Sequence, residues 1–414
     1  MTERCGTTGF FHVAGTREVL QAFAWVSPRP AERVAILDAL GRALARDVVA
    51  AIDVPHFTRA AMDGYAVAAA DTFGASESQP AYLTLRGAVA MGAAPDGRVA
   101  PGEAMRIATG GMLPYGADAV VMWEHTRESG DLLEVTRPVA PGEHLVTVGE
   151  DVREGERVLD AGRVLRPADI GLLAGLGVTQ IEVARRPRVA IVSTGDELVA
   201  PEQTPGPGQV RNVNQYSLGA WVRQTGCEPV LLGRVRDDAG EILERLREGT
   251  AGNDLVLVSG GSSAGARDLT RAVVERLGDP GLLFHGIAVR PGKPTVVGAH
   301  RGVPVFGLPG HPISAMVIFL VLVRPVLERM LGVAPGEAGL TVRARIVDNL
   351  PSQAGREDYY QVTLRPGADG MEAVPVFRKS GLVTAMVRGR GMVRVPPERE
   401  GLEAGELVEV EILA

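Results

Sequence analysis

Carboxylates follow the predicted ends of three buried strands in the middle of the chain. They are Glu197 in STGDEL, Asp238 in RDDAGE and Asp268 in SGGSSAGARD. Because parallel strands end at one edge of a sheet, we expect the three side chains to gather there. Clustered carboxylates beside a phosphate site hold Mg²⁺, which takes oxygen ligands. Taken singly, Asp196 or Asp238 is better explained as a helix N-cap and Glu197 as a first-turn acid, but the set of three favours a site.

The turn before Asp268 is rich in glycine and serine. Glycines let the backbone turn tightly and expose its N–H groups, serines add hydroxyls, and the following helix contributes a positive dipole end. The turn therefore predicts an anion or phosphate site, although it matches neither a Walker A sequence nor GxGxxG. A turn that binds nothing is the alternative. The residues concerned are Ser259, Gly260, Gly261, Ser262, Ser263 and Gly265.

Two further turns accompany the strands of the same region. GLPGHPISA places Pro309 and Pro312 around a helix start, where proline is tolerated because its missing N–H has no helical partner. Their fixed φ angles can also aim backbone N–H groups at an oxyanion. His311 is a candidate general acid or base, but a lone turn histidine is more often solvated. RPGKP supplies the basic residues Arg290 and Lys293.

Two turns nearer the N-terminus show no chemistry of their own. Asp63 stands in RAAMDGYAV and Thr109 in RIATGGMLPYGADAVV. Asp-Gly and Thr-Gly-Gly in apolar surroundings are typical of hairpin and loop turns. Nothing in the adjacent sequence makes either residue catalytic.

The elements that must position these residues form distinct blocks. Residues 187–332 alternate strands with helices, which predicts a mostly parallel sheet covered by helices on both faces. Residues 52–151 and 339–414 contain short apolar runs between turn residues, as β domains do. Apolar spacing of three and four predicts two helices in residues 17–51, and PADIGLLAGLG predicts another that ends near Gly175 and Gly177.

These blocks predict a multidomain α/β and β protein with a central three-layer α/β domain. The small β domain is inserted near the N-terminus, and the C-terminal β domain is expected to be barrel-like. The expected domains are a helical or mixed one at 15–54 plus 150–185, the small β domain at 55–149, the α/β domain at 186–334 and the C-terminal domain at 335–414.

Composition narrows the classes of function. The 414 residues are 45% hydrophobic and 22% charged, with a net charge of −7 and no long basic run, so nucleic acid is not an expected partner. Cys5 and Cys227 are too few for a disulfide framework. The most apolar stretch, AMVIFLVLV, is far shorter than the roughly 20 residues of a membrane span. We expect a cytoplasmic protein that does not enter a membrane.

The motifs taken together resemble one family. Nine motifs occur in this order along the chain: AMDGYAV, ATGGMLPYGADAVV, EDVREGE, STGDELV, NVNQYSL, RDD, SGGSSAGARD, PGKP and LPGHPISA. The resemblance that they carry covers the chain from about residue 17 to 414. They are similar to the molybdopterin molybdenumtransferases of the MoeA type, the family that also forms the C-terminal part of gephyrin. Each motif is weak alone, but nine in register are highly specific.

The resemblance implies an L-shaped, four-domain subunit in a homodimer, with each site formed between the α/β domain of one subunit and the small β domain of the other. It implies the final step of molybdenum cofactor assembly. Molybdopterin adenylate and molybdate are the substrates, Mg²⁺ is the cofactor, and AMP is released. It also implies two kinds of partner, a molybdopterin adenylyltransferase and the enzymes that accept the finished cofactor.

The resemblance also assigns residues by position. The functional set is Asp63, Thr109, Glu197, Asp238, Asp268, Pro309 and Pro312, of which Glu197 and Asp268 are assigned to the metal or to positioning water. The residues expected to bind the substrate are Gly195, Asp196, Asn214, Ser259, Gly260, Gly261, Ser262, Gly265, Arg290, Lys293, Gly310, His311 and Ser314.

The chain departs from the family pattern at several positions. Ala60 stands where the family has serine, His311 where it has asparagine, and Asn212 where it has aspartate; SSAG at 262–265 replaces VSVG. Ala60 and His311 touch the expected pocket. They keep two alternatives open: a non-catalytic cofactor-binding scaffold, and an enzyme with an altered substrate or a preference for tungstate.

Overall fold

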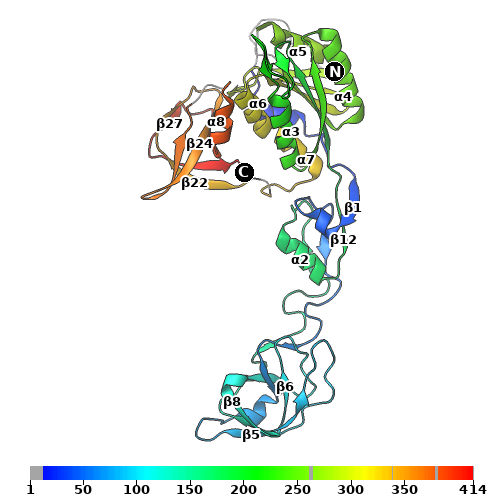
Figure 1. Ribbon diagram of the computed structural model, residues 1–414, viewed down its shortest axis with the longest axis vertical. Helices are drawn as coiled ribbons and strands as arrows, with labels where there is room; N and C mark the ends of the chain where they lie inside the picture. Colours follow the sequence, from blue (N-terminus) through cyan, green and yellow to red (C-terminus); the bar gives the residue numbers. More distant parts are fainter. Residues whose placement is uncertain (1–12, 261–263, 338, 378–380, 414) are drawn as a thin grey trace, which may run out of the picture. The chain divides into compact units, whose positions relative to one another are not determined.

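The computed structural model describes residues 13–260, 264–337, 339–377 and 381–413. The chain divides into two compact units (Figure 1). The first comprises Met1–Arg46, Ala161–Arg166 and Gln180–Ala414, and the second comprises Asp47–Asp160 and Pro167–Thr179.

A six-stranded sheet forms the centre of the first unit, in the order β16-β13-β17-β21-β20-β18. The first four strands in this order are parallel, and β20 and β18 add an antiparallel edge. This confirms the mostly parallel sheet. The strands are β13 (Arg188–Thr194), β16 (Glu228–Val235), β17 (Leu255–Gly260), β18 (Pro280–His285), β20 (Val296–His300) and β21 (Val303–Pro309).

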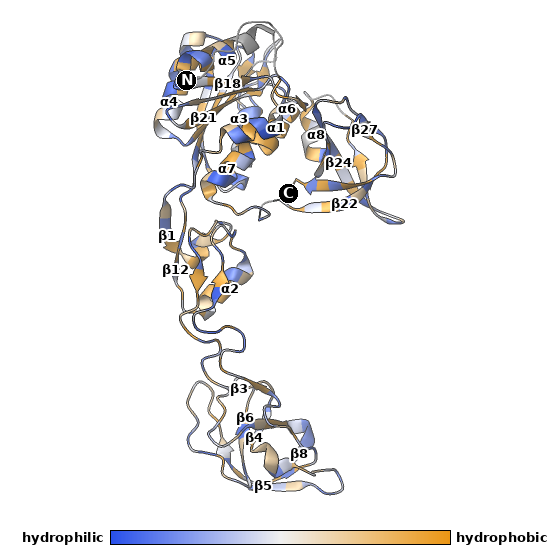
Figure 2. Ribbon diagram, turned by 180° about the vertical axis from the view of Figure 1, so that it is seen from behind, coloured by the Kyte–Doolittle hydropathy of each residue, from blue (hydrophilic) through white to orange (hydrophobic). Residues whose placement is uncertain are grey.

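Helices cover both faces because successive strand residues point to opposite sides. Ile191 belongs to the core under α3, α6 and α7, whereas Val192 belongs to the core under α4 and α5. In Figure 2 the strands are mostly hydrophobic and α4 carries hydrophilic residues. The helices are α3 (Asn214–Gln224), α4 (Ala239–Gly252), α5 (Ala264–Leu277), α6 (Pro312–Ile318) and α7 (Arg324–Leu331), with a π-helical turn at Phe319–Val323. Within the described residues, none of these or the other helices has the length and apolarity to cross a membrane.

The N-terminal region differs from the prediction of two helices. The first helix is present as α1 (Thr16–Ala22). The second is wrong: β1 (Ala31–Ala35) pairs antiparallel with β12 (Gln180–Ala184) and is followed by a 3₁₀ turn at Ile36–Ala39. Gly41 then has φ +72°, a conformation that ends a helix. Pairing with a strand about 150 residues away therefore overrides the local apolar spacing.

The second unit contains the small β domain, whose sheet has the order β7-β4-β6-β5-β9-β8. These strands are β4 (Gly64–Val67), β5 (Ala81–Ala88), β6 (Glu103–Ile107), β7 (Ala119–Met122), β8 (Thr126–Ser129) and β9 (Leu132–Val135). The helix expected near Gly175 is α2 (Pro167–Gly175). Short pairs are β2 (Val48–Val49) with β11 (Arg157–Leu159) and β3 (Arg59–Ala60) with β10 (Leu145–Val146).

The C-terminal β domain is a closed barrel, as expected. Five strands follow the order β24-β25-β22-β28-β26, and β26 pairs again with β24. They are β22 (Thr341–Ile346), β24 (Glu357–Gly367), β25 (Gly370–Pro375), β26 (Gly391–Val395) and β28 (Leu407–Ile412). The short elements beside them are β23 (Leu350–Pro351), β27 (Gly401–Leu402) and α8 (Val383–Arg388).

A parallel pair joins the α/β region to the barrel. β19 (Val289–Arg290) lies beside Glu357 and Asp358 of β24. The backbone N–H of Ala288 donates to the carbonyl of Ala14, and that of Glu357 donates to the carbonyl of Ala288, both at 2.8 Å. Segments from three parts of the sequence therefore share one hydrogen-bonded seam.

Candidate active site

A pocket of about 560 Å³ lies where β13 and β17 end. The segment after β13 returns as the short parallel pair β14 (Leu198–Val199) and β15 (Val210–Arg211) and forms one wall. The barrel side contributes Gly381 and Val383. The other lining residues are Thr194, Glu197, Leu198, Pro205, Gln209, Val210, Arg211, Asn212, Val213, Asn214, Ser259, Gly260, Gly310, His311 and Pro312.

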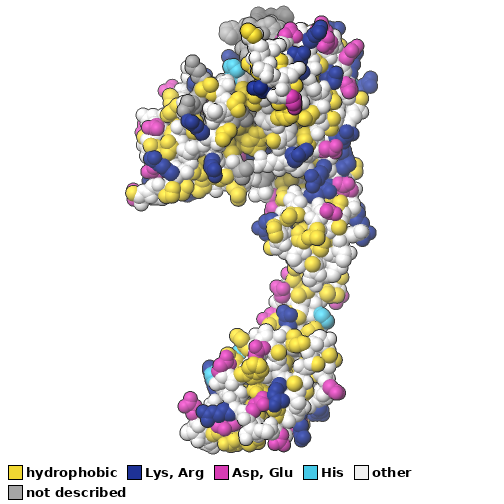
Figure 3. All heavy atoms as spheres, in the orientation of Figure 1, with side chains coloured by type: hydrophobic (Ala, Val, Ile, Leu, Met, Phe, Trp, Pro, Cys, Tyr) yellow, Lys and Arg dark blue, Asp and Glu magenta, His cyan; other side chains and the backbone are white. Residues whose placement is uncertain are grey.

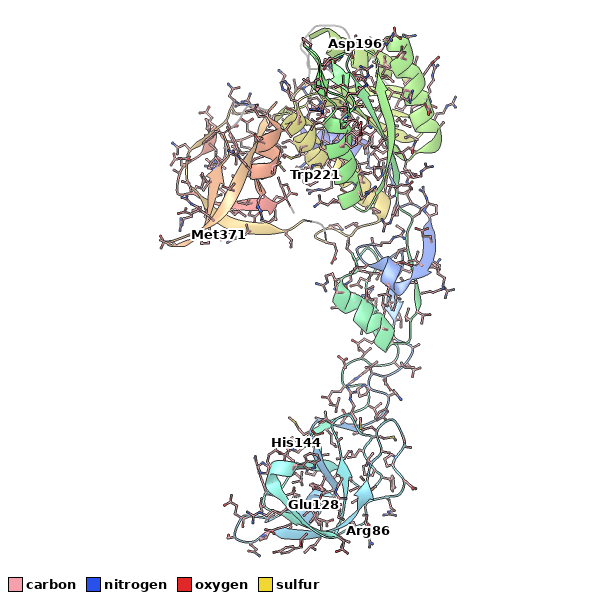
Figure 4. All side chains as sticks on the ribbon, in the orientation of Figure 1. Arg86, Glu128, His144, Asp196, Trp221 and Met371 are labelled. Carbon is pink, nitrogen blue, oxygen red and sulfur yellow. The ribbon has the colours of Figure 1, made fainter. Side chains whose placement is uncertain are left out.

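Seven of the residues predicted from the sequence therefore line one pocket: Glu197, Asn214, Ser259, Gly260, Gly310, His311 and Pro312. Pro309 and Ser314 are buried next to them, and Gly195 and Asp196 form the turn after β13 (Figure 4). Gly261 and Ser262 lie outside the described residues. Gly265 and Asp268 belong to α5, but the structure does not describe their side chains.

The contact between β13 and β17 explains why position 260 is glycine. A Cβ atom on Gly260 would stand 2.0 Å from the Thr194 hydroxyl oxygen. Thr194 is only 2% exposed and is the last residue of β13, which lies between β16 and β17, so it has little room to move away. The glycine thus allows the two strand ends to approach closely at the pocket.

Asn214, the first residue of α3, connects two walls of the pocket. Its amide nitrogen donates to the Ser259 hydroxyl oxygen at 2.6 Å and to the Gly310 carbonyl at 2.9 Å. Asn214 and Ser259 are 7% and 3% exposed. The amide oxygen of Asn214 is buried and accepts no hydrogen bond from the described residues.

A second buried hydrogen-bond network connects Asn212 of the pocket wall to Ser193 and Gln215. The Asn212 oxygen accepts from the Ser193 hydroxyl at 3.1 Å and from the Gln215 backbone N–H at 3.3 Å. The Asn212 amide nitrogen donates to the Gln215 side chain at 3.1 Å. Asn212, one of the departures from the family pattern, is therefore tied into the protein on both sides of its amide group.

The two aspartates after β16 have different surroundings. Asp238 is exposed and is the N-cap of α4, where its carboxylate accepts from the N–H groups of Gly240 and Glu241 at 2.8 and 2.9 Å. Asp237 is half-buried, and one of its oxygens is buried without a hydrogen-bond partner among the described residues. The assignment of Asp238 to the site stays a prediction, and the structure adds Asp237, which the sequence reasoning missed.

Asp237 faces the acidic turn that follows β13. Burial raises the pKa of Asp237, and the charges of Asp196 and Glu197 raise it further. Hydrogen bonds from the Asp196 backbone and the Thr194 hydroxyl offset only part of this effect. Within the described residues, no three acidic, histidine or cysteine side chains surround a single point as a metal site requires. The carboxylates thus concentrate negative charge at the strand ends without forming a complete metal cage.

The positive charge of the pocket comes from an unexpected residue. Arg211 carries it among the described lining residues, and its Nε atom donates to the Pro201 carbonyl at 2.9 Å. Arg290 and Lys293 are exposed and do not line the pocket. Arg290 instead lies 3.4 Å from Asp358, in the seam with the barrel. The weak sequence signal for Arg211 was its place just before Asn212 and Asn214.

Asp63 and Thr109 come together in the second unit. The Thr109 backbone N–H donates to the Asp63 carboxylate at 2.7 Å. This bond, together with one from the Thr109 hydroxyl, lowers the pKa of Asp63. Both residues are exposed, so a carboxylate held in its charged form and a hydroxyl face solvent side by side. Two turns 46 residues apart therefore form one polar cluster, which neither turn indicated alone.

Other charges are distributed over the surface. Figure 3 shows Lys and Arg side chains interspersed with Asp and Glu on the visible face. In the small β domain, Arg106 holds the Glu128 carboxylate through bonds of 2.7 and 2.5 Å, and Figure 4 labels Glu128 there. These pairs stabilise the domain locally and lie apart from the Asp63–Thr109 cluster in the hydrogen-bond network.

A sheet with helices on both faces, a closed barrel and a polar pocket at the strand ends define a multidomain α/β enzyme. Residues 13–177 match the MoeA N-terminal region (domain I and II). Residues 190–329 match a family described as "Probable molybdopterin binding domain", and residues 343–413 match the MoeA C-terminal region (domain IV). The chain therefore belongs to the MoeA family and acts in molybdenum cofactor biosynthesis.

Relatives extend over most of the chain. A molybdopterin molybdenumtransferase of Haemophilus influenzae is 33% identical and covers 93% of this chain and 94% of its own. One of a Nostoc species is 38% identical, covering 80% of this chain and 77% of its own. A crystal structure of a molybdopterin biosynthesis MoeA protein from Pyrococcus horikoshii has a TM-score of 0.80 at 37% identity, over 97% of this chain and 99% of that one. These similarities confirm the resemblance inferred from the motifs.

Proposed function

We propose that this protein carries out the final step of molybdenum cofactor assembly. Molybdenum from molybdate is inserted into adenylylated molybdopterin, while water cleaves the pyrophosphate bond and AMP leaves. The pocket at the ends of β13 and β17 is the observation that supports this proposal most directly. Its volume of about 560 Å³ lies within the usual range for small-molecule sites, and it combines an acidic edge with an arginine and buried hydroxyls.

Mg²⁺ fits the acidic edge of this pocket. Burial raises the pKa of Asp237, and the nearby charges of Asp196 and Glu197 raise it further, so a cation bound beside these three carboxylates would favour their ionised forms. Mg²⁺ is commonly held by one or two carboxylates together with substrate phosphates and water. We assign Glu197 and Asp237 to this role, with Asp268 as the third candidate from the sequence. When bound, Mg²⁺ would neutralise charge on the phosphates.

The protein's own residues contribute binding and orientation. Arg211 attracts the phosphates or the molybdate dianion, since guanidinium groups pair with oxyanions. His311 and Pro312 shape the pocket beside Gly310, and Pro312 occupies the first position of α6. Gly381 and Val383 line the pocket on the side of the barrel.

We further propose that Asp63 and Thr109 complete the pocket of a partner subunit in a homodimer. Their polar cluster is exposed on the small β domain, and the family resemblance assigns it to the reaction. The substrate would come from a molybdopterin adenylyltransferase, and the product would pass to cofactor-accepting enzymes. A cytoplasmic location suits this exchange.

The reaction can be tested directly with the purified protein. It is incubated with adenylylated molybdopterin, Mg²⁺ and molybdate, and AMP and metal-loaded cofactor are quantified. Glu197→Ala should abolish AMP release without unfolding, whereas Glu244→Ala on the exposed face of α4 should have no effect. Wild-type protein that binds substrate but releases no AMP would instead be a cofactor-binding scaffold. Repeating the assay with tungstate measures metal preference.

The shared site can be tested by mixing two inactive variants. If Asp63 and Glu197 act in one site across the dimer, a heterodimer of Asp63→Ala and Glu197→Ala subunits contains one intact site and one doubly altered site. Random mixing should then restore about one quarter of wild-type activity, because half the dimers are mixed and half their sites are intact. Mixtures without activity would show that the two residues do not complete each other's sites across subunits.

A further inference from the structure

The amide group of Asn214 has a fixed orientation. The Gly310 carbonyl, 2.9 Å from the amide nitrogen, can only accept a hydrogen bond, so nitrogen and not oxygen must face it. The second N–H points at the Ser259 oxygen, 2.6 Å away. Both hydrogens are therefore used within the pocket wall, and only the oxygen remains for a ligand.

That oxygen is buried and unpaired among the described residues, although Asn214 lines the pocket and is only 7% exposed. A buried acceptor without a donor is unfavourable, so native sites rarely keep one unless a ligand or water supplies the donor. Ser259 complements it: its oxygen accepts from Asn214, and its hydroxyl proton can be donated. The pair thus presents an acceptor next to a donor.

We propose that Asn214 and Ser259 recognise the organic part of the substrate through a group bearing N–H or O–H, and not an oxyanion. Molybdate and ionised phosphates have no proton to give to the Asn214 oxygen, and their own oxygens would be repelled by it. The amide edge of a pterin, with N–H beside C=O, matches the acceptor–donor pair. Adenosine carries the same chemistry in its amino group and hydroxyls. The inference rests on the proposed function, because only that substrate combines such groups with phosphates.

The proposal divides the pocket by chemistry. The Asn214–Ser259 wall takes the heterocycle or sugar, and the oxyanions lie toward Arg211 and the acidic edge with its cation. The Gly/Ser turn led us to expect that Ser259 binds phosphate. In this arrangement Ser259 instead forms a hydrogen bond with the organic group. The division predicts that ligand classes respond differently to the same substitution.

The test measures three ligands separately at pH 8: molybdopterin, AMP and molybdate. Their dissociation constants are determined by calorimetry for the wild type, Asn214→Leu and Ser259→Ala. The matched control is Asn253→Leu. This asparagine is the C-cap of α4, donates to the Gly249 carbonyl at 2.9 Å, also has an unpaired oxygen among the described residues, and does not line the pocket. It should leave all three constants within about twofold, since it contacts no ligand.

Asn214→Leu should raise the dissociation constant of molybdopterin or of AMP about tenfold or more, and leave that of molybdate within twofold. The ligand whose binding weakens identifies the organic group that Asn214 contacts, and Ser259→Ala should weaken the binding of the same ligand. If Asn214→Leu does not fold, Ser259→Ala decides by the same criterion. Equal weakening of molybdate, or no weakening of either organic ligand while the wild type binds both, would refute the inference but leave the proposed function. A wild type that binds neither organic ligand would refute both.

Discussion

Substitutions of the two adjacent aspartates after β16 are expected to have opposite effects: at Asp238 they should lower stability, and at Asp237 they should lower AMP release. Asp238 caps α4 through two backbone N–H groups, at 2.8 and 2.9 Å. Removing an N-cap carboxylate costs about 1 kcal/mol, so Asp238→Ala should lower the Tm by roughly 2–4 °C. Asp238→Asn retains a capping oxygen and should stay close to the wild type. Neither substitution should change AMP release, because the carboxylate is exposed and engaged with its own helix.

Asp237 should show the converse. Its folded-state pKa lies above the unfolded value because of burial and the charges of Asp196 and Glu197. Ionisation in the fold is therefore unfavourable, and stability falls as pH rises from the unfolded pKa through the folded one. Asp237→Asn should therefore be more stable than the wild type at a pH above the folded-state pKa. Below the unfolded-state pKa the two proteins should be equally stable. Since the group is partly solvated, the gain at neutral pH should be only a few tenths of a kcal/mol.

The rate of AMP release should depend on Asp237 and not on Asp238. Losing a carboxylate from the proposed cation site should reduce AMP release by about two orders of magnitude. Thermal unfolding and AMP release are measured on the same preparations of Asp237→Asn, Asp238→Ala and Asp238→Asn. A loss of AMP release in Asp238→Ala with an unchanged Tm would refute the reasoning and restore the sequence-based assignment of Asp238.

Three further predictions concern other parts of the molecule. Gly260→Ala should destabilise by about 1–3 kcal/mol through the 2.0 Å contact with the Thr194 hydroxyl, and adding Thr194→Ala should recover most of the Tm. Cys227, 1% exposed and with a pKa raised by burial to about 12, should resist thiol reagents at pH 8 until the protein unfolds, as followed in a variant without Cys5. Hydrogen bonds from Arg106 and from the Tyr65 hydroxyl lower the pKa of Glu128 to about 2, so these contacts stabilise the fold above the unfolded pKa of 4.5 and less as pH falls toward 2. Glu128→Gln should flatten that acid dependence in a titration of the full chain, and an unchanged curve would contradict it.

Much of the α/β region was predictable because its signals are local. Strands such as β13 and β17 are continuous apolar runs ended by glycine, and α4 begins at an aspartate and repeats its apolar residues at helical spacing. The segment at 31–39 failed because its apolar spacing also fits a strand, and pairing with β12 decided between the two. The edge strands β18 and β20 were not predicted, because the glycines and prolines around them are typical of turns.

The candidate site was only partly predictable for a similar reason. Sequence placed two aspartates at 237 and 238, but which of them caps α4 depends on where the helix begins, to within one residue. The positive charge was expected from RPGKP, whereas Arg211 reaches the pocket by the β14–β15 pairing. The bond between Thr109 and Asp63 depends on a sheet that brings separate turns together. Short-range patterns thus identified several of the loops that line the pocket, and tertiary pairing decides which of their residues do so.

The seam formed by β19 has a consequence for dividing the chain into fragments. A piece spanning residues 190–329 corresponds to a recognised family unit, yet it would contain β19 without β24 and without Ala14. Ile287 and Val289, almost fully buried in the complete chain, would become exposed next to unpaired backbone groups. Open strand edges of this kind promote association between chains. Chimaeras between relatives should therefore exchange the segment before β1, the α/β region and the barrel as one inherited block.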